Sequence, residues 1–182
     1  KFGGKNLNSK VIYNAVDLKE FFPVNKKTIS EEFSIVAVEG SVQGNLALKA
    51  LKTISSYTID VYGNINKEFK QKILLYNNKN VNLRGPIPRI DIPKVFYGKK
   101  IYLCLEINPA CPNSVIEALA SGVPVVGYNS GSLKELVGNA GIILPYTGGD
   151  PNKMEGPNCS NLNSALTQIK KNYNYYSDLA RS

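Results

Sequence analysis

Short, mainly apolar runs alternate with segments of helical spacing from residue 33 onward. The apolar runs predict strands at residues 33–38, 58–62, 80–83, 100–105, 123–127 and 141–144. Apolar positions at helical spacing predict helices at residues 46–54, 67–76, 92–97, 113–121, 133–137 and 161–173, with a turn or two more at 175–181. Asn45 is the expected N-cap of the first helix.

This alternation is typical of parallel βαβ units. Several of the apolar runs lack a polar face, as strands do when helices cover both sides of a sheet. The predicted fold class is therefore α/β: a doubly wound, Rossmann-like parallel sheet of about six strands with helices on both faces. Ligands bind such sheets in the loops at the carboxyl ends of the strands, which selects residues 39–44, 85–89 and 108–113.

Residues 1–32 contain one short apolar run, at 10–13, and no regular pattern. We expect them to form an interdomain lead-in or linker, and residues 33–182 to form one domain. The 182 residues suffice for one well-packed core.

The composition excludes several kinds of chemistry. The chain has no histidine, which removes Ser-His-Asp and Cys-His catalysis and histidine metal sites. Its three cysteines, Cys104, Cys111 and Cys159, contain no C-x-x-C pair, so we expect neither a zinc site nor a disulfide framework. With no apolar run near the ~20 residues of a membrane span and no signal segment, the expected location is the cytoplasm.

The net charge of +8 comes mostly from scattered lysines. No motif of basic and aromatic residues accompanies them, so nucleic acid is not an expected partner. A solvated lysine-rich surface and attraction to phosphates or an anionic membrane both stay open, and with them peripheral association of a parent protein with the inner face of a membrane.

Residues 108–126 (NPACPNSVIEALASGVPVV) hold the most informative pattern. A loop leads into a helix that carries Glu117 one turn inside it. A helix N-terminus suits a phosphate, and a carboxylate one turn further can accept hydrogen bonds from both hydroxyls of a ribose. Ser114 and Glu117 also have the spacing of a capping box, which the spacing alone favours, and Asn113 is a second candidate N-cap.

Residues 111–126, followed by 130–137 (SGSLKELV), resemble the C-terminal half of the family 4 glycosyltransferases of the GT-B fold. Residues 11–17 (VIYNAVD) with Phe22 and Pro23 resemble the family's entry into its second domain. Residues 80–85 (NVNLRG) resemble the strand that reaches the base pocket, and residues 176–181 (YSDLAR) resemble a late helix. The resemblance covers essentially the whole chain.

The resemblance implies one half of a GT-B fold, the half that binds a nucleotide-sugar donor such as a UDP- or GDP-sugar, without a cofactor or metal. Glu117 would hold the ribose, and the amides of Asn113, Ser114 and Val115 would face the sugar and diphosphate. Three residues of one loop would line the base: Gly85, Pro86 and Ile87. The phosphates would lie by Gly40 and Ser41.

The chain departs from the family at two points. The family's first glutamate falls on Pro109, which cannot replace a carboxylate; Glu106, expected on the strand, is no assured substitute. The family's Arg and Lys pair in the first strand and its loop is also missing from residues 35–48. Lys49 follows on the next helix, where a solvated position is expected. The remaining nearby cations are Arg84, Arg89 and Lys94.

The resemblance therefore implies the donor-binding domain of a retaining, metal-independent glycosyltransferase that acts on a saccharide or lipid-linked acceptor. Its partner would be an N-terminal acceptor domain of the same chain, and the catalytic residues stay unassigned. The alternative is a non-catalytic nucleotide-sugar-binding module that regulates or scaffolds a partner glycosyltransferase. An oxidoreductase is disfavoured because no G-x-G-x-x-G follows the first strand. The sequence does not identify the nucleotide, the sugar or the acceptor.

Overall fold

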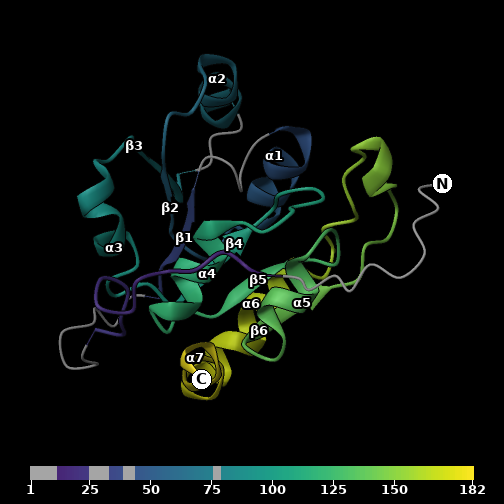
Figure 1. Cartoon of the computed structure of the whole chain (residues 1–182). Helices are drawn as coiled ribbons and strands as arrows, with labels where there is room; N and C mark the ends of the chain where they lie inside the picture. Colours follow the sequence, from purple (N-terminus) through teal and green to yellow (C-terminus); the bar gives the residue numbers. More distant parts are fainter. Residues whose placement is uncertain (1–11, 25–32, 39–43, 76–78) are drawn as a thin grey trace, which may run out of the picture.

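A computed structural model of the chain describes residues 12–24, 33–38, 44–75 and 79–182. The described part contains a parallel sheet whose strands are β1 Ile35–Val38, β2 Ile59–Tyr62, β3 Val81–Gly85, β4 Ile101–Cys104, β5 Val125–Tyr128 and β6 Gly141–Leu144. Their order across the sheet is β3-β2-β1-β4-β5-β6 (Figure 1). Every pairing is parallel, which confirms the predicted doubly wound α/β fold.

The first five helices connect these strands in chain order, and the last two follow β6. They are α1 Gly44–Thr53, α2 Lys67–Leu75, α3 Ile92–Val95, α4 Asn113–Ala120, α5 Leu133–Val137, α6 Leu162–Lys171 and α7 Tyr173–Arg181, with short 3-10 turns η3 Arg89–Asp91 and η4 Pro151–Lys153. Because α1 begins at Gly44, Asn45 lies inside the helix and the expected cap there is wrong.

The two faces of the sheet carry separate apolar cores. One core joins the sheet to α1, α2 and α6, and the other joins it to α3, α4 and α5. All four residues of β4 and of β5 are buried, as expected for strands covered on both sides. Within residues 12–24, 33–38, 44–75 and 79–182, no helix is long and apolar enough to cross a bilayer.

The strand order reverses between β1 and β4, which lie side by side. In open α/β sheets this switch point is where ligands bind, in the loops beyond the carboxyl ends of the strands. The loop after β1 includes residues 39–43, which lie outside the described residues. The loop after β4 is described in full and leads directly into α4.

Candidate functional site

The start of α4 faces the switch point of the sheet. Pro112 holds the N-cap position with extended backbone angles, φ −71° and ψ 116°. Its carbonyl accepts hydrogen bonds from the amides of Val115 (3.1 Å) and Ile116 (3.4 Å). Among the described residues, the amides of Asn113 and Ser114 have no acceptor. Together with the helix dipole, these two amides form a partly positive end that can attract an anion.

The capping box predicted for Ser114 and Glu117 is wrong. The helix begins two residues earlier than that motif requires, and no side chain of the described residues caps it. Ser114 Oγ instead accepts a hydrogen bond from the Tyr102 hydroxyl at 2.8 Å. Asn113 is not the cap either, because its Oδ1 accepts a hydrogen bond from Asn14 Nδ2 at 2.8 Å. The Glu117 carboxylate is therefore not used to cap α4.

Glu117 lines a cavity of about 260 Å³ beside the first turns of α4. Asn113 and Ile116 share that wall, and Arg89 at the start of η3 reaches the cavity from the loop after β3. The opposite wall belongs to the lead-in segment, through Ala15, Val16, Asp17, Glu20 and Phe21. The structure thus brings Glu117 and Asn113 together, as the sequence predicted, and adds residues that the sequence did not single out.

The lead-in is held in place by specific contacts. Asn14 Nδ2 donates to the Cys111 carbonyl at 3.0 Å as well as to Asn113, and the Tyr13 hydroxyl donates to the Glu135 carboxylate. Phe21 is buried with its ring 6.2 Å from that of Phe96. These contacts hold the part of the lead-in that lines the cavity, between Ala15 and Phe21, against the rest of the domain. The resemblance of residues 11–17 to the family's domain entry was the feature of the sequence that could have pointed to this wall.

The charges in the cavity set what it can bind. Burial raises the pKa of the Glu117 carboxyl, and the nearby Arg89 guanidinium opposes that rise. Asp17 and Glu20 bring two more carboxyls against the single arginine. Carboxylates accept hydrogen bonds from hydroxyl and amino groups but repel phosphate. The cavity therefore suits a group that carries hydroxyl or amino groups better than it suits a phosphate.

Arg84, Arg89 and Lys94, the three cations near the predicted phosphate site, differ in their contacts. Arg84 Nε bonds Asp60 Oδ1 at 2.8 Å, and Lys94 Nζ bonds Asp91 Oδ1 at 2.6 Å. Arg89 alone of the three lines the Glu117 cavity. Lys49 is exposed on α1, as expected for a solvated lysine.

The other predicted binding residues are only partly placed. Gly85 ends β3 with a positive φ of 78°, and Ile87 packs against the core on the α4 side of the sheet. Gly85, Pro86 and Ile87 precede Arg89 in the same loop but are not among the residues lining the cavity. Gly40 and Ser41 lie outside the described residues.

The loop between β4 and α4 contains Pro109, the first of the two departures from the family, and the nearby Glu106. Strand β4 ends at Cys104, so Glu106 lies beyond the strand, and its expected place on the strand is wrong. It is half-buried, and burial raises the pKa of its carboxyl. Pro109 is buried, and its carbonyl accepts hydrogen bonds from Ser132 N (2.8 Å) and Ser132 Oγ (3.1 Å). A buried proline therefore stands at the sequence position where the resemblance expects a carboxylate.

Several solved structures that match this fold are glycosyltransferases. HepE of Anabaena, in a structure with UDP-glucose, matches with a TM-score of 0.71 and 20% identity over 98% of this chain and 53% of its own. Sucrose-phosphate synthase of Thermosynechococcus elongatus gives a TM-score of 0.68 and 18% identity over 91% of this chain and 44% of its own. WaaG, a glycosyltransferase of lipopolysaccharide biosynthesis, gives 0.65 and 16% over 86% and 44%. This chain thus spans about half the length of these proteins.

The sequence itself gives the family. No curated protein matches the chain. The family described as Glycosyl transferases group 1 matches residues 38–179, from the end of β1 into α7, which is well over half of the chain. The fold, the cavity beside α4 and this match agree: the chain belongs to the group 1 family of glycosyl transferases.

Proposed function

We propose that this chain is the donor-binding half of a retaining glycosyltransferase, which moves a hexose or similar sugar from a nucleoside-diphosphate sugar to a saccharide or lipid-linked acceptor. The observation that carries the proposal is the Glu117 carboxylate, which does not cap α4 and lines a cavity beside the start of that helix. The family match and the UDP-glucose complex of HepE support a nucleotide-sugar as the ligand.

In this proposal, each part of the site takes one part of the donor. The Glu117 carboxylate accepts hydrogen bonds from the ribose hydroxyls, and the positive charge of Arg89 stabilises its ionised form. The loop of Gly85, Pro86 and Ile87 lines the base. The amides of Asn113 and Ser114 meet the sugar and diphosphate, since the amide of Val115 is taken by Pro112.

The chemistry proposed for the whole enzyme needs a second domain that holds the acceptor. The acceptor hydroxyl attacks the anomeric carbon on the face from which the diphosphate leaves, and a phosphate oxygen of the leaving group takes the proton. The helix-end amides stabilise the charge that develops on that diphosphate. The cytoplasmic setting and the association with a membrane face stay predictions from the sequence.

A non-catalytic binding module is the second candidate. Its support is Pro109, which is buried and tied to Ser132 where the resemblance expects a carboxylate near the transferred sugar. Such a module would bind the donor as well as an enzyme does. Donor binding therefore tests what the two candidates share, and turnover separates them.

Titration calorimetry with UDP, GDP and UDP-glucose tests the shared part. Glu117→Gln should weaken binding by about ten- to a hundred-fold, because each hydrogen bond to a charged acceptor contributes about 1.5–3 kcal/mol. Glu68→Gln, at an exposed carboxylate on α2 that pairs with Lys72, is the matched control and should bind like the parent. Equal binding by the Glu117 and Glu68 variants would contradict the assignment of the ribose to Glu117.

The same titration with excess EDTA tests the proposed independence from metal. Among the described residues, no group of three or more Cys, Asp or Glu side chains is arranged to hold a metal ion. Affinity should therefore survive chelation. A ten-fold loss, about 1.4 kcal/mol, would show a metal-dependent donor site.

A further inference from the structure

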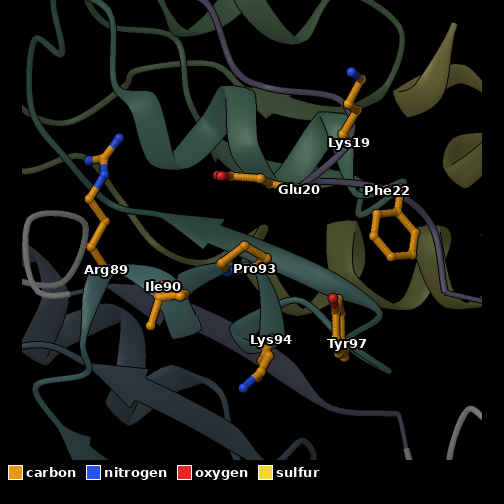
Figure 2. Close-up of a pocket in the computed structure, with 8 residues that line it drawn as sticks. All are labelled: Lys19, Glu20, Phe22, Arg89, Ile90, Pro93, Lys94 and Tyr97. Carbon is orange, nitrogen blue, oxygen red and sulfur yellow. The ribbon is translucent and has the colours of Figure 1, made fainter.

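A second, larger hollow runs beside the Glu117 cavity. It lies between the lead-in segment and the η3–α3 stretch and has a volume of about 540 Å³ (Figure 2). That volume falls in the ~300–1,000 Å³ range of sites for small molecules. We call it the α3 groove; none of the roles proposed above uses it.

One end of the α3 groove is aromatic and apolar. The rings of Phe22 and Tyr97 lie 6.2 Å apart at an angle of 50°, and 41% and 38% of these residues are exposed. Ile90, also in the groove, is 85% exposed. This end presents ring faces and aliphatic surface that nothing among the described residues covers. The negative faces of such rings attract polarised C–H groups.

The remainder of the groove carries polar groups of both signs. The Glu20 side chain extends between the two walls, and Arg89 stands at the end away from the aromatic pair (Figure 2). Lys19 adds a further cation at the rim. Lys94 contributes less, because its ammonium is bonded to Asp91 at 2.6 Å. Hydrogen-bond acceptors and donors therefore face the same space as the aromatic end.

We propose that the α3 groove binds a short saccharide. A sugar ring has C–H groups on its faces and hydroxyls around its edge, which matches ring faces at one end and a carboxylate with a guanidinium at the other. An acyl chain would remove Glu20 and Arg89 from water without a hydrogen bond to either, at a high cost in desolvation. A polyphosphate would meet the repulsion of the same carboxylate and has no C–H faces to pack against the aromatic pair.

The α3 groove lies next to the proposed donor site. The part of the inference that concerns an acceptor or product rests on the function proposed above. Glu20 and Arg89 line both the α3 groove and the Glu117 cavity. A saccharide in the groove would therefore adjoin the bound donor, as part of an acceptor or product. Shared residues also couple the two sites, so each ligand changes the affinity for the other by the same factor.

The test titrates the chain, by calorimetry and by NMR, with maltotriose, cellotriose, chitotriose and mannotriose. At least one of these should bind. Tyr97→Ala and Phe22→Ala should each weaken that binding by about ten-fold. Tyr175→Ala removes an exposed tyrosine from α7 and should leave it unchanged. Melting curves report whether each variant folds.

Other outcomes overturn the proposal. Failure of all four trisaccharides to bind would do so, as would binding that survives both Tyr97→Ala and Phe22→Ala. Binding to phosphatidylglycerol vesicles that Tyr97→Ala abolishes, with no trisaccharide bound, would assign the groove to a membrane surface. UDP titrations keep this test separate from the donor site, because Tyr97→Ala should retain UDP binding and Glu117→Gln should retain saccharide binding.

Discussion

The carboxyl of Glu117 is placed at a cost to folding. Burial disfavours its charged form and raises its pKa above the value that it has in the unfolded chain. Its protonated form therefore favours the folded state at low pH, and this contribution is lost as the pH rises through the raised pKa. At neutral pH the ionised group costs stability, which is common for side chains kept for binding.

Two pH effects should follow from this raised pKa. Nucleotide affinity should fall on acidification at a higher pH than the pKa of an ordinary glutamate, because protonation removes the charged acceptor. Glu117→Gln should lose this pH dependence and should melt no lower than the parent at neutral pH. Affinity measured by titration across pH, with melting curves of both proteins, checks this. A marked drop in melting temperature would assign Glu117 a structural role instead.

Asp60 is a charged residue with a structural role. It lies on β2 with 6% of its side chain exposed and accepts hydrogen bonds from Asn82, Arg84 and Lys99. Burial alone would raise its pKa, but these three donors outweigh burial and lower it. The bonds of its ionised form therefore stabilise the fold above the unfolded pKa, and that contribution is lost as the pH falls through the lowered pKa.

Asp60→Asn should lower the free energy of unfolding by about 3 kcal/mol at neutral pH, because it leaves Lys99 largely buried without its counter-charge. Asp91→Asn breaks an exposed pair with Lys94 and is the control, with an expected cost below about 1 kcal/mol. Urea denaturation measures both. The difference between Asp60→Asn and the parent should shrink under acid. Equal costs for the two variants would contradict a dominant role for the Asp60 network.

At the scale of elements, the loop between β4 and α4 shows where the sequence pattern succeeds and where it fails. The pattern placed a helix at residues 113–121 and put Glu117 one turn inside it, and α4 spans Asn113–Ala120. It favoured a capping box because Ser114 and Glu117 have the right spacing. Spacing carries no information about Tyr102, whose hydroxyl bonds Ser114 from β4. Such a contact between distant residues is set by packing.

Gly131, just before α5, lets the backbone there approach the loop between β4 and α4 closely. A Cβ at Gly131 would lie 2.2 Å from the Pro109 carbonyl oxygen, and the residue has a φ of 54°. Gly138 at the end of α5 has a φ of 51° and nothing within 4 Å of a Cβ. The two glycines therefore share backbone strain and differ in the close approach.

Gly138→Ala should cost about 1–3 kcal/mol of stability, because residues with a Cβ rarely adopt its φ of 51° and ψ of −120°. Gly131→Ala should cost a further ~1–3 kcal/mol, because the Pro109 segment must shift. It should also weaken nucleotide binding, since that segment leads into α4. Denaturation and UDP titration of both variants measure these effects. Indistinguishable variants would show that the contact between Gly131 and Pro109 does not constrain the site.

At the scale of the whole molecule, much of the architecture was predictable. Strands buried on both faces and helices between them predicted the doubly wound sheet, because local patterns report burial directly. The walls of the Glu117 cavity were not predictable in this way. Glu20 and Arg89 are distant along the chain and carry no periodic pattern. They line one cavity because Phe21 anchors the lead-in beside α3.

The last prediction concerns what the molecule can do alone. In the proposed function, one wall of the reaction site is an acceptor domain, and this chain spans 53% of HepE and 44% of sucrose-phosphate synthase. Holding both reactants in contact can supply about 7–11 kcal/mol of a reaction barrier, and a donor-binding half holds only one of them. The isolated chain should therefore bind a nucleotide-sugar and transfer none of its sugar.

The assay incubates the chain with UDP-glucose and each of the four trisaccharides, and follows UDP release and glycan mass. A UDP titration under the same conditions is the control, because it separates a silent assay from an unfolded protein or an unbound donor. Bound donor without transfer is the expected result. Transfer by the isolated chain would show that this half holds donor and acceptor in contact by itself, with Pro109 in place of a carboxylate. It would refute both the need for a second domain and the non-catalytic alternative.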